Sequence, residues 1–284
     1  MSAPSPSSSP SPSSSPSSSA TESVIVTRLR AAGCVFAEDE ARLLISTAAT
    51  PDDLAAMVDR RVGGLPLEHV LGWAEFCGQR IAVDPGVFVP RRRTEFLVRQ
   101  AAVAATATAT ALAGPGAVVV DLCCGSGALG AALAGILGRA ELHAADIDPA
   151  AVRCARRNVA AVGGRVYEGD LYGPLPATLR GRVDILLANV PYVPTEEVGL
   201  LPQEARIHEA RVALDGGADG LDVLRRVTAE APRWLAPGGG LLVETSEHQA
   251  AHAVETVAGS GLIPRVARSE ELCATVVVGT MPAH

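Results

Sequence analysis

The segment from Asp121 to Gly130 combines a carboxylate with glycines whose spacing is typical of a ligand-binding loop. Gly125, Gly127 and Gly130 follow the G-x-G-x-x-G pattern directly after an apolar run. Such a loop joins a strand to a helix, and in dinucleotide-binding proteins the helix N-terminus binds a pyrophosphate. The Asp121 carboxylate would repel that phosphate, but it suits a ligand that carries a cationic amino-acid part beside an adenosine. The loop therefore favours S-adenosylmethionine, with a dinucleotide or a purely structural glycine turn as the alternatives.

A second acidic residue, Asp146, lies 19 positions after Gly127, at the end of the next predicted strand. A carboxylate at this place can accept hydrogen bonds from ribose hydroxyls. Asp170 and Leu171 follow the third predicted strand, and we expect them to flank the adenine. S-adenosylmethionine would be the methyl donor. The complete set of residues predicted to bind this donor is Asp121, Cys123, Cys124, Gly125, Ser126, Gly127, Asp146, Asp170, Leu171 and Asn189.

Asn189, Val190, Pro191 and Tyr192 form a turn directly after the predicted strand 183–188. Ligands of a doubly wound sheet bind at the carboxyl ends of its strands, so this turn lies where chemistry is expected. The Asn189 side chain and the Val190 main chain each offer a carbonyl oxygen, and together they can bind both hydrogens of a planar –NH2 group. Tyr192 can pack on the face of that group. We therefore predict that all four bind substrate and that Asn189 and Tyr192 are catalytic; a proline turn capped by Asn189 is the structural alternative.

Strands that alternate with helices must position these two loops. The predicted strands are 117–122, 141–145, 165–167, 183–188, 239–244, 262–267 and 274–279. The predicted helices between them are 128–137, 149–162 and 221–235. This alternation predicts an α/β fold with a parallel, doubly wound sheet. The last two strands have no full helix between them, which indicates an antiparallel edge.

The chain is predicted to divide into three parts. Residues 1–20 are nearly all serine and proline, and such a segment cannot bury enough apolar area to offset its ordering entropy, so we predict disorder. Residues 21–112 are predicted to form an N-terminal helical domain, with a β-hairpin linker between Trp73 and Val89. Thr50, which is followed by proline, is predicted to cap one of its helices. Residues 113–284 are predicted to form the α/β domain that carries the chemistry.

Composition excludes several classes of activity. All 24 basic residues are arginine, which rules out a Schiff-base lysine, pyridoxal phosphate chemistry and a P-loop lysine. The net charge of −7 argues against a broad nucleic-acid surface. The six cysteines show no C-x-x-C spacing, so we expect neither a metal site nor a disulfide framework. Because no segment reads as a secretory signal or as the roughly 20 apolar residues that span a membrane, we expect a cytoplasmic protein without a membrane partner.

Further segments accompany the two loops: Pro66–Gly72, Phe76, Gly78, Phe88–Arg91, Thr94–Val98, His208–Glu209, Ala213–Gly217, Asp219–Leu221, Glu244 and Gln249. Together they resemble the class I amino-methyltransferases, and more closely the protein-(glutamine-N5) methyltransferases of the HemK/PrmC family. The resemblance extends from about Thr21 to Gly279. It implies S-adenosylmethionine as cofactor, a Rossmann-like catalytic domain with a seven-stranded sheet, and an N-terminal helical domain that helps to recognise the substrate protein. It also implies a function in translation termination, the methylation of the glutamine in the Gly-Gly-Gln loop of peptide chain release factors.

The sequence departs from the family's pattern at four positions. Val190 stands where the family's N-P-P-Y has proline. Cys123 stands at the first glycine of D-x-G-x-G-x-G, and we expect it to adopt an ordinary, negative φ angle. Arg92 and Arg93 replace proline and glutamate of P-R-P-E-T-E and add positive charge near the expected substrate entrance. Two alternative functions therefore stay open: an N6-adenine nucleic-acid methyltransferase, and a module that binds S-adenosylmethionine and has another acceptor or no activity.

Overall fold

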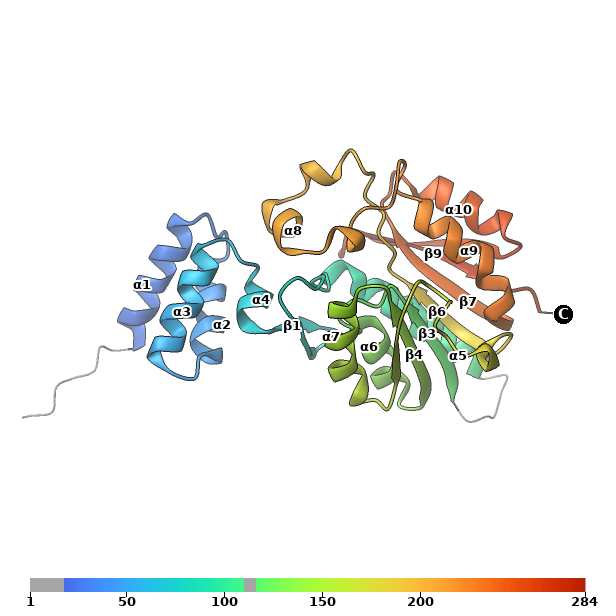
Figure 1. Ribbon diagram of the computed structural model, residues 1–284, viewed down its shortest axis with the longest axis horizontal. Coiled ribbons are helices and arrows are strands. Elements are labelled where there is room, and N and C mark those ends of the chain that lie inside the picture. Colours follow the sequence, from blue (N-terminus) through green and yellow to red (C-terminus); the bar gives the residue numbers. More distant parts are fainter. Residues whose placement is uncertain (1–17, 110–115, 284) are drawn as a thin grey trace, which may run out of the picture. The chain divides into compact units, whose positions relative to one another are not determined.

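The computed structural model describes residues 18–109 and 116–283, which form two compact units that divide between Leu71 and Gly72 (Figure 1). The described part of the first unit consists of α1 (Ser18–Ala31), α2 (Ala37–Thr47), α3 (Pro51–Val62) and α4 (Leu67–Leu71). The Thr50 side chain accepts a hydrogen bond from the Asp53 N–H at 3.1 Å, which confirms the predicted helix cap. Most of the predicted disordered segment, residues 1–17, lies outside the described residues, and α1 already begins at Ser18.

A small apolar core and a buried ion pair hold the helices of the first unit together. Leu29, Leu44 and Met57 are buried in that core. Arg61 on α3 donates to both carboxylate oxygens of Glu40 on α2, at 2.6 and 3.1 Å. Neither side chain is more than 11% exposed. Charges at this depth are tolerated only as a pair, so the ion pair fixes α2 against α3.

The second unit is built on a seven-stranded sheet with the strand order β5-β4-β3-β6-β7-β9-β8. Its strands are β3 (Ala117–Leu122), β4 (Ala140–Asp146), β5 (Arg165–Glu168), β6 (Val183–Ala188), β7 (Leu235–Thr245), β8 (Ile263–Ser269) and β9 (Ala274–Thr280). The strands β3 to β7 pair in parallel, and β9 runs antiparallel to both β7 and β8. The predicted doubly wound α/β sheet with one antiparallel edge is confirmed, and it is the Rossmann-like, seven-stranded sheet that the resemblance implied.

Helices cover both faces of this sheet (Figure 1). The helices α5 (Glu95–Ala109), α6 (Ala128–Leu137) and α7 (Pro149–Ala160) lie on one face, and α9 (Asp222–Trp234) and α10 (Ala250–Gly259) lie on the other. Successive residues of β3 point to opposite faces: Val119 packs in the cluster that includes α5 and α6, whereas Val118 and Val120 pack in the cluster that includes α9. Because both faces are covered, the central strands β3 and β6 are mostly apolar runs, and this signal predicted their bounds correctly. Strand β7 begins at Leu235, four residues before the predicted start and at the residue where the predicted helix 221–235 was expected to end.

The hairpin and α5 belong to the unit that contains the sheet. Strands β1 (Trp73–Phe76) and β2 (Gln79–Ala82) pair antiparallel within the predicted linker. Helix α5 buries Leu97, Val98 and Ala101 in the same cluster as the strand residues beneath it. The unit that contains the sheet therefore begins at Gly72, whereas residues 21–112 were predicted to form one N-terminal domain; residues 110–112 lie outside the described part.

Two helices of the second unit were not predicted from the sequence. One is α10, which covers β8 and β9, and the other is the short α8 (Gln203–His208). The 3-10 turns η1 (Arg92–Thr94), η2 (Ala177–Leu179), η3 (Val198–Leu200) and η4 (Arg211–Ala213) complete the second unit as far as it is described. None of the helices in the described ranges is long and apolar enough to cross a membrane.

Candidate active site

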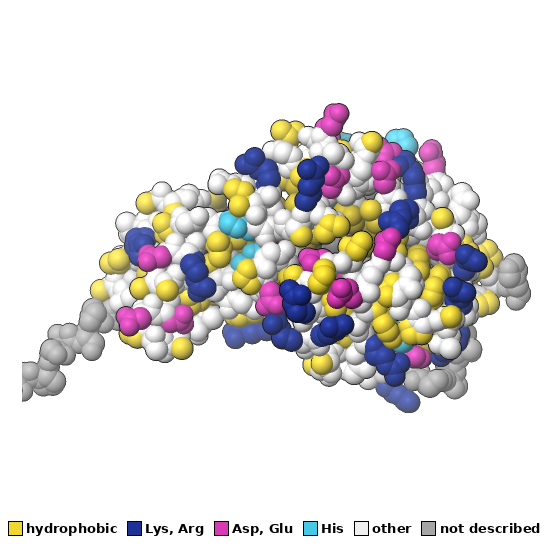
Figure 2. Space-filling view, viewed as in Figure 1, with side chains coloured by type: hydrophobic (Ala, Val, Ile, Leu, Met, Phe, Trp, Pro, Cys, Tyr) yellow, Lys and Arg dark blue, Asp and Glu magenta, His cyan; other side chains and the backbone are white. Residues whose placement is uncertain are grey.

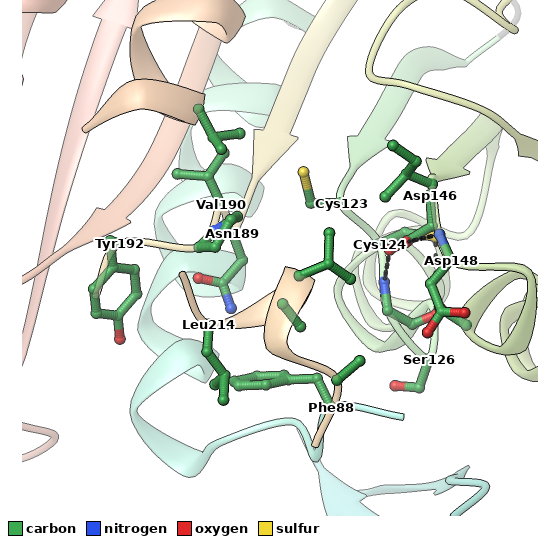
Figure 3. A pocket seen from close by; sticks show the side chains of 18 of the residues that line it. Phe88, Cys123, Cys124, Ser126, Asp146, Asp148, Asn189, Val190, Tyr192 and Leu214 are labelled. Carbon is green, nitrogen blue, oxygen red and sulfur yellow. Dashed lines mark hydrogen bonds between the residues drawn. The ribbon is translucent and has the colours of Figure 1, made fainter. Parts of the chain in front are cut away.

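A cavity of about 810 Å³ opens at the carboxyl ends of β3, β4 and β6, between the two loops that carry the sequence motifs (Figure 3). Its volume is in the range of sites for small ligands. Residues from the segments 88–93 and 201–214 complete its walls. Figure 2 shows apolar side chains gathered in the hollowed region beside α8, with charged side chains around it. The predicted site residues that line the cavity are Cys123, Cys124, Gly125, Ser126, Asp146, Asp170, Leu171, Asn189, Val190, Pro191 and Tyr192.

The loop after β3 has a backbone conformation that most residues disfavour. Gly125 and Gly127 have φ angles of +54° and +75°, and Cys123 has a φ angle of +53°. The expectation of an ordinary φ for Cys123 is therefore wrong, since this cysteine adopts a left-handed conformation of the kind that glycine takes most easily, at a cost of roughly 1–2 kcal/mol. The Gly125 N–H donates to Asp146 Oδ2 at 2.8 Å. A contact with the end of β4 thus holds the loop in this conformation.

Two predicted donor contacts, Asp121 and Gly127, do not line the cavity. Asp121 is 1% exposed, and its Oδ2 accepts a hydrogen bond from the Gly130 N–H at 2.9 Å. Burial raises the pKa of the Asp121 carboxyl to about 7, and the charge of Asp146 acts in the same direction. Gly127 begins α6 so close to α7 that a Cβ there would lie 2.8 Å from the Val159 side chain. Both residues hold the start of α6 against its neighbours and do not face the cavity.

The end of the cavity where the methyl donor is predicted to bind is rich in carboxylates. Asp146, Asp148 and Asp170 line it. Asp146 Oδ1 accepts a hydrogen bond from the Asp148 N–H at 2.9 Å, and burial raises the pKa of Asp146. Asp170 pairs with Arg226 at 2.5 Å, with both side chains about half exposed. Excess negative charge disfavours a pyrophosphate and suits a cationic ligand, so the residues present fit S-adenosylmethionine.

Asn158 on α7 connects the glycine loop to the hairpin. Its side-chain N–H groups donate to the carbonyl oxygens of Ser126 at 2.8 Å and Ala82 at 2.9 Å. Its Oδ1 accepts a hydrogen bond from the Ala82 N–H at 2.9 Å. The end of β2 and the donor loop therefore share one side chain, which makes the hairpin part of the scaffold that positions the loop.

Asn189 begins the turn after β6, and its side chain points into the cavity (Figure 3). The Oδ1 atom is buried and accepts no hydrogen bond from the described residues. Val190, the next residue, is 3% exposed and belongs to the apolar core. A buried carbonyl oxygen without a donor costs about 1–3 kcal/mol, which a hydrogen bond from a ligand N–H would recover. The turn thus presents an acceptor for a polar N–H group within an otherwise apolar wall.

A glycine-rich loop supports this turn from behind. The Gly216 N–H donates to the Val193 carbonyl at 2.8 Å, and a Cβ at Gly216 would lie 2.6 Å from the Pro191 oxygen. A Cβ at Gly220 would lie 2.3 Å from the Tyr192 oxygen. The two backbones touch, so a side chain at either glycine would displace the turn. The two glycine-containing segments Ala213–Gly217 and Asp219–Leu221 therefore support the turn through this close backbone contact.

The ring of Tyr192 lies beside the turn and lines the cavity (Figure 3). Its hydroxyl donates to Glu244 Oε1 at 3.3 Å and accepts a hydrogen bond from Arg93. Burial raises the pKa of this hydroxyl well above its usual range, and the Glu244 charge acts in the same direction. Tyr192 therefore stays neutral at neutral pH, as expected for a wall and not for a general base.

Some residues at the cavity were not predicted as site residues. Phe88 and Leu214 lie close together below Asn189 (Figure 3). Arg91, which also lines the cavity, pairs at 2.5 Å with the carboxylate of Glu209, which is 1% exposed. Their only signal was the family resemblance of the segments that contain them. A single sequence does not reveal the Arg91–Glu209 contact, because it joins positions 118 residues apart.

Known proteins are similar to this chain over most of its length. The family model described as "Methyltransferase small domain" matches residues 81–219. The release factor glutamine methyltransferase of Geobacter sulfurreducens is 40% identical over 214 residues, which are 74% of this chain and 70% of the relative. That of Mycolicibacterium smegmatis is 37% identical over 238 residues, 82% of each chain. A 4-amino-L-phenylalanine/4-methylamino-L-phenylalanine methyltransferase of Streptomyces pristinaespiralis is 38% identical over 199 residues, 68% of this chain and 65% of the relative. By these similarities, this chain belongs to the release factor glutamine methyltransferase family.

Proposed function

We propose that this protein transfers a methyl group from S-adenosylmethionine to the side-chain amide nitrogen of a glutamine, in the Gly-Gly-Gln loop of peptide chain release factors. The proposal combines the family membership with the geometry of the turn after β6. The observation that carries it is the buried Oδ1 of Asn189, which accepts no hydrogen bond from the described residues although it lies at the cavity. A primary amide offers the N–H group that such an oxygen requires.

The donor would be held by the loop after β3 and by the ends of β4 and β5. At Gly125 the backbone can approach the donor closely, and the Asp146 carboxylate can accept hydrogen bonds from the ribose hydroxyls. Asp170 and Leu171 would surround the adenine. When bound, S-adenosylmethionine supplies a methyl group on a positively charged sulfur. The carboxylates of this end favour binding of that positive charge.

Catalysis by this chain is mainly a matter of orientation. An amide nitrogen is a weak nucleophile because its lone pair is delocalised, so its direction of approach must be fixed. The Asn189 side chain and the Val190 carbonyl would bind the two amide hydrogens, while the Tyr192 ring limits movement on one side. Hydrogen bonds of this kind can contribute about 2–4 kcal/mol to catalysis, by analogy with oxyanion-hole donors.

A protein acceptor is supported by the segment beside the cavity. Leu200, Ile207 and Val212 are 82%, 56% and 50% exposed, and Val212 also lines the cavity. Exposed apolar side chains around a cavity are typical of a surface that contacts another protein. The net charge of −7 disfavours a nucleic-acid acceptor. We place the reaction in the cytoplasm, where release factors act.

A small arylamine is the second candidate acceptor. Phe88 and Leu214 lie close together near Asn189, where they could enclose an aromatic ring whose amino group reaches the turn (Figure 3). The relative from Streptomyces pristinaespiralis is named for such a substrate. Both candidates present an –NH2 group to the same oxygen. They differ in the rest of the acceptor molecule, which the walls of the cavity must contact.

Incubation of the purified protein with radiolabelled S-adenosylmethionine and either a bacterial release factor or 4-aminophenylalanine separates the two candidates. We expect label on the glutamine of Gly-Gly-Gln, located by mass spectrometry, and none on a release factor in which that glutamine is alanine. Label only on the arylamine would replace the proposed acceptor. Donor binding without transfer to either one would contradict the proposal.

A further inference from the structure

Arg93 connects three elements that are far apart in the sequence. It lies in η1, and its Nε pairs with Oε1 of Glu244, at the carboxyl end of β7, at 3.0 Å. Its Nη2 donates to the hydroxyl of Tyr192, in the turn after β6. The guanidinium also lies 5.8 Å from the centre of the Tyr192 ring. One side chain therefore touches both the hydroxyl and the ring of the tyrosine that lines the cavity.

The partner of Arg93 is a buried carboxylate. The Glu244 side chain is 3% exposed, and its Oε1 pairs with the Arg93 guanidinium and accepts a hydrogen bond from the Tyr192 hydroxyl. A carboxylate at this depth requires a positive partner, because its desolvation is otherwise uncompensated. Arg93 itself is 47% exposed and lines the cavity. The contact thus extends from the interior of the sheet to the wall of the site.

Arg93 is also a departure from the family's pattern, in which P-R-P-E-T-E has glutamate at this position. A glutamate here has no N–H group, so it could neither pair with the Glu244 carboxylate nor donate to the Tyr192 hydroxyl. The three-residue contact is therefore a property of this sequence. It places a planar guanidinium, which can donate in two directions at once, between the carboxylate and the tyrosine.

We propose that Arg93 is a positioning residue that determines how the acceptor is held: it fixes the Tyr192 ring as a wall of the acceptor site by holding the hydroxyl against Glu244. The placement of the ring is independent of the substrate, whereas its effect on the acceptor rests on the proposed function. Neighbouring Arg92 provides a matched control, because it is exposed and is not among the described residues that line the cavity.

The first test observes the ring without any substrate. The protein has three tyrosines, so incorporation of 3-fluorotyrosine gives a simple fluorine NMR spectrum in which Tyr192→Phe assigns one signal. We expect Arg93→Gln to shift and broaden the Tyr192 signal, while Arg92→Gln leaves it in place. Arg93→Lys keeps a positive partner for Glu244, so this variant should remain folded. Because lysine lacks the planar guanidinium, we expect it to shift the Tyr192 signal as well. An unchanged signal in both folded Arg93 variants would overturn the proposal.

The second test measures methyl transfer. We expect Arg93→Gln to raise KM for the acceptor about tenfold, with Arg93→Lys intermediate, while the Kd of the donor stays within about twofold. In a Tyr192→Phe background, Arg93→Gln should have little further effect, because both act through one hydroxyl. Fully additive effects would show that Arg93 does not act through Tyr192. If the unsubstituted protein methylates no acceptor, the proposed function fails, and the NMR result alone decides the placement of the ring.

Discussion

Gln249 donates a hydrogen bond from Nε2 to the main-chain oxygen of Tyr192 at 2.9 Å, across 57 positions of the chain. The same nitrogen donates to the Asp219 oxygen at 3.0 Å. One amide group from the start of α10 therefore fastens the turn after β6 to the glycine-rich loop behind it. The candidate catalytic turn is held by side-chain and backbone contacts from both sides, so its geometry depends on residues that touch no substrate.

A substitution at Gly220 tests directly whether the loop behind the turn supports it. A Cβ at this position would lie 2.3 Å from both the Tyr192 oxygen and the Gln249 nitrogen, and the φ angle is +78°. We expect Gly220→Ala to lower the free energy of unfolding by about 3 kcal/mol, from left-handed strain and steric overlap together, and to reduce methyl transfer. Gly199→Ala is the matched control, because a Cβ there meets nothing within 4 Å. Equal unfolding curves for the two variants, followed by tryptophan fluorescence, would contradict the close approach.

Asn189→Ala removes the side-chain acceptor of the turn. Since such hydrogen bonds contribute about 2–4 kcal/mol to the barrier, we expect kcat to fall by about 30- to 1,000-fold. The donor Kd, measured by calorimetry, should change by less than about threefold, because the other donor contacts come from β3, β4 and β5. An Asn189→Ala variant that transfers methyl groups at the original rate would remove this residue from the catalytic turn.

The raised pKa of Asp121 predicts that the free energy of unfolding depends on pH. Its pKa is raised from 3.8 to about 7 by burial, so the folded chain binds the proton more tightly than the unfolded chain. This carboxyl therefore contributes stability that is complete below about pH 4 and is lost as the pH rises toward 7. Asp121→Asn does not ionise and keeps an acceptor for the Gly130 N–H. Relative to the unsubstituted protein, this variant should gain stability between pH 4 and pH 7.

Urea unfolding at several pH values measures this gain. Both tryptophans, Trp73 and Trp234, lie in the second unit, so their fluorescence reports the unit that contains Asp121. Glu271→Gln, an exposed substitution in the same unit, is the control for charge removal. A stability difference for Asp121→Asn that does not change with pH would show that the carboxyl titrates normally.

The ion pair of the first unit predicts a local effect. Glu40→Ala leaves the Arg61 guanidinium buried without its carboxylate, and we expect a loss of about 3–5 kcal/mol in the stability of that unit. Amide hydrogen exchange should accelerate in α2 and α3 but not in the sheet. Asp59→Ala breaks a more exposed pair with Arg28 and should change exchange little. Similar exchange in the two variants would indicate that the buried pair does not stabilise the helices.

Local sequence signals were sufficient for most of the secondary structure and for the donor loop. The apolar runs 117–122 and 183–188 coincide with β3 and β6, because a strand covered on both faces is apolar at most of its positions. The glycine spacing after β3 and the cap at Thr50 are decided by residues within a few positions of one another. Such features depend on short-range geometry, which a single sequence records directly.

Only the tertiary structure decided which of these residues face the cavity. Asp121 lies in the predicted motif, yet its side chain turns toward Gly130 and the interior. Cys123 adopts a positive φ angle because neighbouring contacts outweigh its local preference. The pairing of Arg93 with Glu244 joins residues 151 positions apart and could not be inferred from either one alone. The sequence thus determined the elements and their chemistry, whereas long-range packing and burial determined their orientation, because the free energy of a buried charge or a strained backbone depends on groups that only folding brings together.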